Sequence, residues 1–216
     1  MQRESLSAKR DSFIDSEDTS AIFLKFSKPI NIQVSTKNLL DLQRVLDLYN
    51  VSFGLMYGTL LGAIREKNFI IHDHDTDLFV LREEEFKVMD MIKEAKKIGF
   101  TIGRYSEAYI SFVRDGDFID IYFMDKKFGK YHCDGHVIPS KYLDDLINYS
   151  FLGSTFKISR DYENLLTYLY GKDWRTPQKN VSPTHYGLYL KVKYFMKNHF
   201  RMIFIIVSWL KGKLYV

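Results

Sequence analysis

The stretch YGTLLGAIREKNFIIHDHDTDLFVL, residues 57–81, contains the features that decide the fold and the chemistry of this chain. In it, Asp73, Asp75 and Asp77 occupy alternate positions just before the apolar residues 78–81. Alternate side chains of a strand point to the same face, so these carboxylates are expected to converge. Converging carboxylates repel one another unless a cation compensates them, and Mg²⁺ prefers carboxylate oxygens. The pattern therefore predicts a site for a divalent metal.

A Gly-Thr pair precedes the acids. Gly58-Thr59 lies between the apolar segment 51–56 and a helix-like stretch, residues 60–66. The first N–H groups of a helix have no acceptor inside the helix and can bind a phosphate. A phosphate-binding turn beside an acidic metal site is typical of phosphoryl transfer. Taken alone, a Gly-Thr pair is more often a helix cap, and an acidic cluster more often a turn.

A third acid, Asp120, is embedded in the apolar run FIDIYF, residues 118–123. A buried carboxylate without a partner is costly, so Asp120 is expected to have one. A metal shared with the upstream acids is one candidate partner. A salt bridge with Arg114 or Arg104 is the alternative, and the sequence leaves both open.

Two separated segments resemble the LicD family, which includes the fukutin-related transferases, within the nucleotidyltransferase (DNA polymerase β-like) superfamily. The family's GTLLGA-(V/I)-R signature corresponds to residues 58–65, and its F-I-P-W-D-D-D-I-D-like stretch to residues 69–77. Its closing segment resembles residues 151–158 and 168–177. The resemblance covers roughly residues 37–180. It departs from the family where Ile71-His72 replaces Pro-Trp and His74 replaces the middle aspartate.

The resemblance implies an α+β fold of the nucleotidyltransferase type, a mixed sheet flanked by helices with the acids on neighbouring strands. Hydrophobic spacing and caps predict the elements. Helices are expected from a cap at Ser35 or Thr36 to Asn50, and over 60–66, 83–98, 142–149 and 162–170, and strands over 51–56, 78–81, 100–103, 109–113 and 118–124. Asp115-Gly116 predicts a hairpin turn, and Gly99 a helix end.

Three parts of the chain are expected: an N-terminal arm (1–34), a catalytic domain (35–180) and a helical C-terminal extension (181–216). Residues 22–34 are expected to hold short strands or a turn. Residues 186–216 are both basic and apolar, which is typical of a helix lying in the plane of a membrane. The alternative is a helix packed on the core or on a second subunit.

Composition sets the remaining limits. The chain has 216 residues and a formal charge of +4, which suits anionic substrates or an anionic membrane surface. Its single cysteine, Cys133, excludes an internal disulfide. The first 20 residues lack the apolar core of a signal peptide. We therefore expect a cytoplasmic protein, peripheral on the inner face of the cell membrane through residues 186–216, with no nucleic-acid partner.

The resemblance also implies a reaction. A phosphorylated small alcohol, of the phosphocholine or polyol phosphate type, would pass from a CDP-linked donor to a hydroxyl of a cell-surface glycan or a lipid-linked precursor, releasing CMP. The residues that would catalyse this reaction and hold Mg²⁺ (or Mn²⁺) are Asp75, Asp77 and Asp120. Those that would contact the donor phosphates are Gly58, Thr59 and Arg65.

Two other functions fit the same residues. The first is transfer of a nucleoside monophosphate from a nucleoside triphosphate to a small molecule or protein, for which the same acids would serve. The second is a membrane-associated binding protein without turnover. Release of CMP, release of pyrophosphate, and binding of CDP compounds without turnover distinguish the three.

Overall fold

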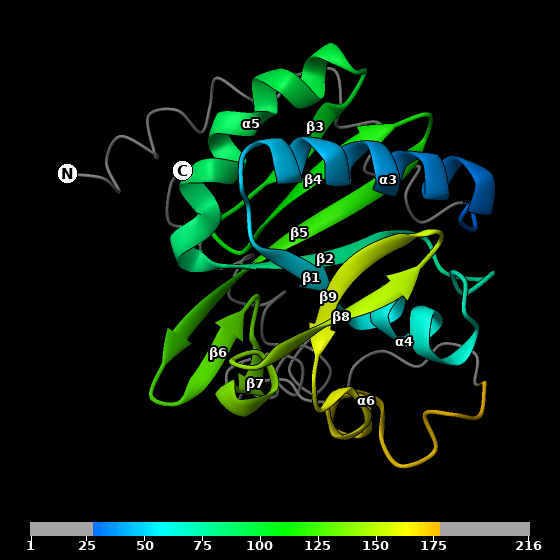
Figure 1. Ribbon diagram of the computed structural model, residues 1–216, viewed down its shortest axis with the longest axis vertical. Coiled ribbons are helices and arrows are strands. Elements are labelled where there is room, and N and C mark those ends of the chain that lie inside the picture. Colours follow the sequence, from blue (N-terminus) through cyan, green and yellow to red (C-terminus); the bar gives the residue numbers. More distant parts are fainter. Residues whose placement is uncertain (1–27, 178–216) are drawn as a thin grey trace, which may run out of the picture.

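A computed structural model describes residues 28–177, which form a nine-stranded mixed sheet flanked by helices (Figure 1). The strands are β1 (Phe53–Leu55), β2 (Thr76–Leu81), β3 (Thr101–Tyr105), β4 (Tyr109–Arg114), β5 (Asp117–Lys127), β6 (Lys130–Cys133), β7 (His136–Pro139), β8 (Leu146–Phe151) and β9 (Ser154–Ser159). The helices are α3 (Ile32–Leu48), α4 (Tyr57–Arg65), α5 (Glu85–Lys97) and α6 (Tyr162–Tyr170), with 3₁₀ turns η1 (Arg82–Glu84) and η2 (Ser140–Tyr142).

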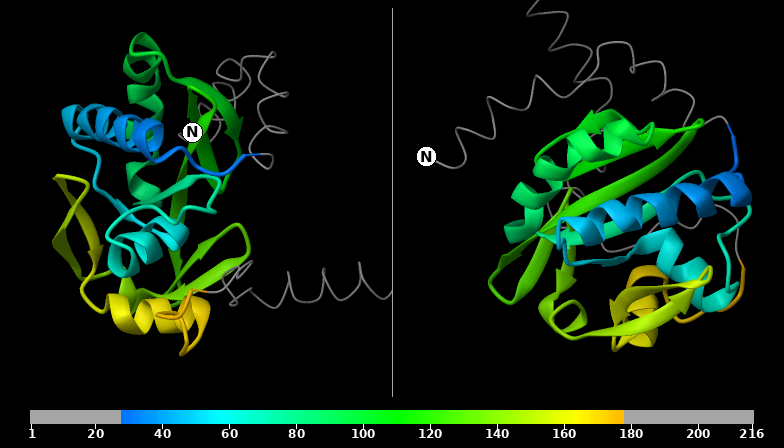
Figure 2. Two further views of the ribbon diagram at one scale, coloured as in Figure 1. Left: turned by 90° about the vertical axis from the view of Figure 1, so that its right-hand side faces the viewer. Right: turned by 45° about the horizontal axis from the view of Figure 1, so that its top comes forward.

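The strand order is β3-β4-β5-β2-β1-β9-β8, and the β6–β7 hairpin pairs with the far end of β5. The pairs β2–β5 and β1–β9 are parallel and the others antiparallel. Helices α3 and α5 lie side by side over the sheet, while α4 lies beside β2 and α6 beside β9 (Figures 1 and 2). The predicted mixed sheet with flanking helices is confirmed.

The two faces of β5 differ in character, as a period of two requires. Ile121 and Phe123 are fully buried, and the Phe123 ring meets that of Tyr105, whose hydroxyl donates to Glu85 at the start of α5. This is therefore the face that α5 covers. Asp120 alternates with these residues and points to the opposite face, where the polar site lies.

Two predicted turns are confirmed. Asp115 and Gly116 both have positive φ angles, 54° and 75°, as the two central residues of a hairpin turn matched to the twist of the strands require. Helix α5 ends before Gly99, whose φ of 93° is one that glycine adopts without a steric penalty.

Two predicted elements are wrong. Helix α3 begins at Ile32, before the predicted caps, because the Asn31 side chain already accepts from the amides of Gln33 and Val34 at 3.1 and 3.2 Å. The helix predicted over 142–149 is instead the end of η2 followed by β8. Its pairing with β9, across a tight Leu152-Gly153 turn with positive φ angles, outweighs the helical spacing of that segment.

Residues 1–27 and 178–216 lie outside the description, and with them most of the expected N-terminal arm and the whole segment for which a basic C-terminal helix is expected. Among residues 28–177, no helix has both the length and the apolar composition needed to cross a bilayer.

The start of β5 generates a stability prediction. Burial raises the pKa of Asp117 to about 6, although Asn38 lies at 3.5 Å from its carboxylate. Because the folded pKa lies above the unfolded one, Asp117 destabilises the fold when ionised, and this cost grows as pH rises from about 4 to about 6. Asp117→Asn should raise the unfolding free energy by roughly 2 kcal/mol at pH 7.5 and much less at pH 4.

Urea unfolding at the two pH values measures the difference. Asp115→Asn, on an exposed residue of the same hairpin, is the matched control and should change neither value. A loss of stability in Asp117→Asn at pH 7.5 would contradict the prediction.

Candidate active site

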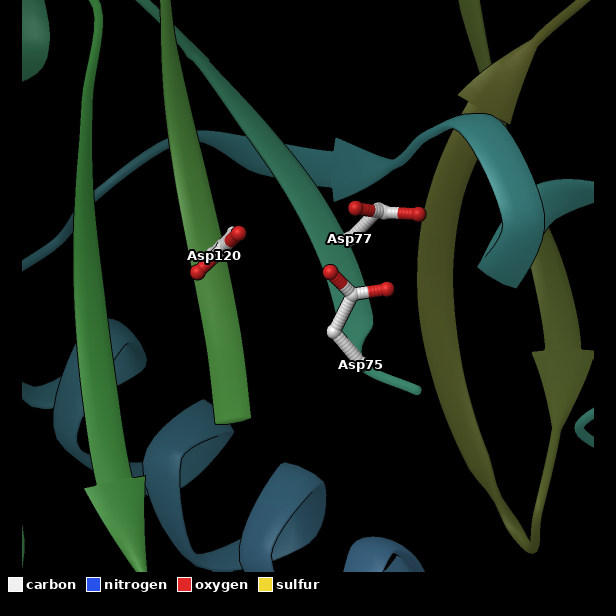
Figure 3. A group of neighbouring side chains, drawn as sticks. All are labelled: Asp75, Asp77 and Asp120. Atoms are coloured by element: carbon white, nitrogen blue, oxygen red, sulfur yellow. The ribbon is translucent and has the colours of Figure 1, made fainter. Parts of the chain in front are cut away.

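Three acids meet at the junction of β2 and β5. One carboxylate oxygen from each of Asp75, Asp77 and Asp120 lies within 4.8 Å of the others (Figure 3). The parallel register places Asp77 directly beside Asp120, so both side chains share one face of the sheet. Asp75 joins them from the bend just before β2. This is the group that the sequence predicted, with Asp73 outside it.

The spacing of these oxygens fits a small divalent cation. Oxygens on opposite sides of a magnesium ion lie about 4.2 Å apart, because each bond is about 2.1 Å long. The observed limit of 4.8 Å is close enough for small side-chain rotations to complete the site. Carboxylates are also the hard ligands that magnesium prefers.

The N-terminus of α4 holds Asp77 in place. The Gly58 amide donates to Asp77 Oδ2 at 3.1 Å, and the Asp77 amide donates to Thr59 Oγ1 at 2.7 Å. The helix end favours a negative charge, and here it faces Asp77. Thr59 is 1% exposed. Both residues therefore position one acid of the triad, and their predicted contact with phosphate stays a prediction.

Gly58 also permits a close approach that no other residue would. A Cβ at this position would lie 2.2 Å from Asp73 Oδ2, well inside contact distance. Asp73 itself accepts from the His74 amide at 3.0 Å and lines the cavity described below. The glycine is thus required by the crowding of helix and acidic loop.

Asp120 has both kinds of partner that the sequence left open. Besides the other two acids, it contacts Arg104, whose Nη2 lies 2.8 Å from Asp120 Oδ2, and Ser111, whose hydroxyl donates to Oδ1 at 2.5 Å. Arg114 is not a partner of Asp120, because it is bound to Asp41 and Asn38. Ser111 was not singled out by the sequence, since a serine in a strand carries no distinctive signal.

A cavity of about 1130 Å³ opens beside the acids. Asp75 and Asp77 line one part of it, and one side of α4 forms a wall that runs from Tyr57 to Arg65. At 1.5 Å per residue, this wall is about 12 Å long. The cavity is therefore large enough for a ligand that reaches well beyond the acids.

Arg65 lies at the end of this wall remote from Asp77. Its Nε contacts Glu66 at 2.7 Å, and its Nη1 donates to the Trp174 carbonyl at 3.0 Å. Arg65 thus lines the cavity, and its hydrogen bond to Trp174 connects the segment after α6 with α4. A role for Arg65 in binding phosphate stays a prediction.

Three tyrosines, Tyr57, Tyr122 and Tyr170, add neutral groups to the cavity lining. Burial raises the pKa of each of them well above its usual value, so their hydroxyls remain protonated. Tyr57 adopts a positive φ of 42°, an uncommon conformation for a bulky residue, and its ring packs edge-on against Tyr122 with centroids 5.0 Å apart. Sequence patterns gave no signal for these residues.

Cys133 does not line the cavity and is not part of the acidic group. Burial raises the pKa of Cys133 to about 12, and its Sγ donates to the Ala108 carbonyl at 3.1 Å. Within residues 28–177, the acidic group described above is the one cluster whose spacing suits a metal.

The sequence matches the model of one protein family. The family model described as LicD/FKTN/FKRP, nucleotidyltransferase domain, matches residues 50–161. The match covers more than half of the chain and contains the three acids, α4 and both strands of the site. The chain therefore belongs to the LicD family.

Individual relatives match shorter segments. An uncharacterized protein of Rickettsia prowazekii is 26% identical over 102 residues, 47% of this chain and 37% of that protein. One of Rickettsia typhi is 26% identical over 105 residues, 49% and 32% respectively. The lipopolysaccharide cholinephosphotransferase LicD of Haemophilus influenzae is 40% identical over 60 residues, 27% of this chain and 23% of its own length. The matches span less than two fifths of these relatives.

Solved structures of the antibiotic-resistance factor ANT(2'')-Ia are distantly similar. Its solution structure superposes with a TM-score of 0.49 at 10% identity, covering 69% of this chain and 77% of that one. Its crystal structure in complex with adenylyl-2''-tobramycin gives 0.47 at 11% identity, covering 67% and 79%.

The triad generates the first site prediction. Asp75→Asn should abolish binding of Mn²⁺ at concentrations that saturate the wild type, because a metal ligand is weakened. The melting temperature of the metal-free protein should stay equal or rise, because repulsion within the triad is relieved. Titration followed by electron paramagnetic resonance, beside a thermal melt, measures both. Asp73→Asn is the control and should still bind Mn²⁺, while wild-type affinity in Asp75→Asn would contradict the assignment.

The crowding at Gly58 generates a second site prediction. Gly58→Ala should weaken Mn²⁺ binding at least about tenfold, since the added methyl group displaces Asp73 and disturbs Asp77. Secondary structure by circular dichroism should be retained, because alanine favours a helix by about 1 kcal/mol over glycine. Unchanged Mn²⁺ affinity would show that the crowding is relieved without moving the acids.

Proposed function

We propose that this protein transfers a phosphorylated small alcohol from a CDP-linked donor to a hydroxyl of a glycan, releasing CMP. One observation carries the proposal: an acidic triad whose spacing suits a divalent metal lies beside a large cavity, in a chain of the LicD family. The segment shared with a lipopolysaccharide cholinephosphotransferase favours phosphocholine as the transferred group and a surface polysaccharide as the acceptor.

The reaction is an in-line displacement at phosphorus. The acceptor hydroxyl forms a bond to the phosphorus that carries the alcohol, and the bond from that phosphorus to the bridging oxygen breaks. CMP leaves with the electron pair, and the hydroxyl proton passes to a carboxylate oxygen of the site. No oxidant or second nucleotide is required.

Each residue of the site has a task in this scheme. Asp75 and Asp77, which face the cavity, would hold magnesium or manganese together with Asp120. The metal would neutralise charge on the diphosphate. The α4 N-terminus fixes Asp77, and Arg65, which Glu66 and the Trp174 carbonyl hold in place, would meet a donor that extends along the cavity wall. The neutral tyrosines beside the acids add no charge that would repel the donor.

The experiment is a donor screen on the full chain. CDP-choline, CDP-ribitol, CDP-glycerol and CDP-ethanolamine are incubated with and without Mg²⁺, and CMP is measured by chromatography, with water replacing the acceptor. At least one donor should yield CMP only when Mg²⁺ is present. Asp120→Asn should lose this turnover, because the metal site loses a charge, and should keep part of its donor binding.

Nucleoside triphosphates provide the contrasting arm. If the protein released pyrophosphate from them and no CMP from any CDP-alcohol, it would be a nucleoside monophosphate transferase and the proposal would be wrong. Binding of CDP compounds without any turnover would instead indicate a binding protein.

A further inference from the structure

Asp120 belongs to a closed ring of three side chains on neighbouring strands. Arg104 Nε donates to Ser111 Oγ at 3.1 Å, Ser111 Oγ donates to Asp120 Oδ1 at 2.5 Å, and Arg104 Nη2 contacts Asp120 Oδ2 at 2.8 Å. Both oxygens of the carboxylate are thus fixed from one side. The ring therefore sets the rotation of the Asp120 carboxylate, which faces Asp75 and Asp77.

The register of the sheet extends the ring into a row that crosses four strands. Arg104 on β3 pairs with Ser111 on β4, Ser111 pairs with Asp120 on β5, and Asp120 pairs with Asp77 on β2. Paired residues share a face, so all four side chains lie on the face opposite α5. The row leads from the sheet edge at β3 directly to the metal-binding acids.

An irregularity in β3 is what brings Arg104 to this face. The register pairs Ile102 with Phe112 but Arg104 with Ser111, so β3 has one extra residue between these pairs. In a regular ladder Arg104 would pair with Ile110 and share the apolar face of Ile102. The extra residue reverses the face, which is how bulges beside active sites re-aim a side chain.

The bulge has a specific residue at its centre, Gly103. A Cβ there would lie 2.7 Å from Val113 Cγ2, so a larger residue would have to displace the Val113 side chain. The re-aimed guanidinium is then supported by Tyr109, whose ring centroid lies 4.8 Å from the Arg104 Cζ. The Arg104 side chain is 20% exposed and is held on three sides, by an aromatic ring, a hydroxyl and a carboxylate.

We propose that Arg104 is a positioning residue for the metal site: its planar fork, bound to Ser111 and Asp120 together, orients the Asp120 carboxylate and so sets the metal affinity of the triad. The inference rests on the proposed metal-dependent function. It assigns the effect to geometry, because a positive charge beside a metal ligand by itself repels the metal. Groups that orient metal-binding carboxylates change metal affinity about 10- to 100-fold when removed.

The test measures metal binding directly on the full chain. Mn²⁺ is titrated into the wild type, Arg104→Gln, Arg104→Lys and Ser111→Ala, followed by electron paramagnetic resonance, with circular dichroism to check folding. Arg104→Gln should raise the Mn²⁺ dissociation constant about tenfold. Arg104→Lys should raise it similarly, because lysine keeps the charge but lacks the planar fork that holds Ser111 and Asp120 in one fixed geometry. Ser111→Ala should show a smaller rise.

Arg160→Gln is the matched control, because Arg160 forms an exposed ion pair with Asp145 and does not line the cavity. It should bind Mn²⁺ like the wild type. Tighter binding by Arg104→Gln would show that Arg104 competes with the metal, and wild-type binding by Arg104→Lys would show that charge alone matters. Either result overturns the inference.

Two further outcomes separate this inference from the function on which it rests. If the Arg104 variants fail to fold, Ser111→Ala becomes the deciding variant. Unchanged Mn²⁺ affinity in Ser111→Ala would then contradict the inference that the ring sets the metal affinity. If the wild type binds no Mn²⁺, the metal-dependent function falls together with the inference. If the wild type and every variant bind Mn²⁺ equally well, the positioning role of Arg104 is contradicted, while the proposed metal-dependent function stands.

Discussion

The structure of the site depends on one constraint, which is that three carboxylates share a small volume at the junction of β2 and β5. Two negative charges 4.8 Å apart repel by roughly 3 kcal/mol at an effective dielectric constant of about 20. The fold offsets this repulsion from two sides. The N-terminus of α4 faces Asp77, and the guanidinium of Arg104 faces Asp120. Asp75, the most exposed of the three, lies in the bend before β2 and faces the cavity.

Much of the fold follows from local sequence signals. Helix α6 has the predicted bounds because its apolar residues keep helical spacing over the whole segment, and the β4–β5 hairpin follows from Asp115-Gly116. The segment from 142 to 149 was mispredicted because a short apolar pattern suits both a helix and a strand. What decides between them is a partner strand, β9, that only the tertiary fold supplies.

The acids of the site were predictable from the sequence, but most of the residues around them were not. The acids Asp75, Asp77 and Asp120 stand out because charges next to or within apolar runs require compensation. Arg104 was visible as one of two candidate partners, but its selection over Arg114 depends on a one-residue shift in β3. Gly103 is a local signal of that shift, but the face to which Arg104 turns is fixed only when β3 and β4 are paired. Ser111 and the tyrosines of the cavity share this limitation, since their positions are set by register.

The parallel pairing of β2 with β5 has a consequence for how the protein folds. Asp77 and Asp120 are far apart in the sequence, with α5, β3 and β4 lying between them along the chain. Contacts of this kind form slowly, because the intervening chain loses entropy before they contribute stability. A divalent ion held between these strands would bind the native state alone and shift the folding equilibrium toward it by mass action. The abundance of intact protein would then depend on the supply of that ion, separately from any effect on catalysis.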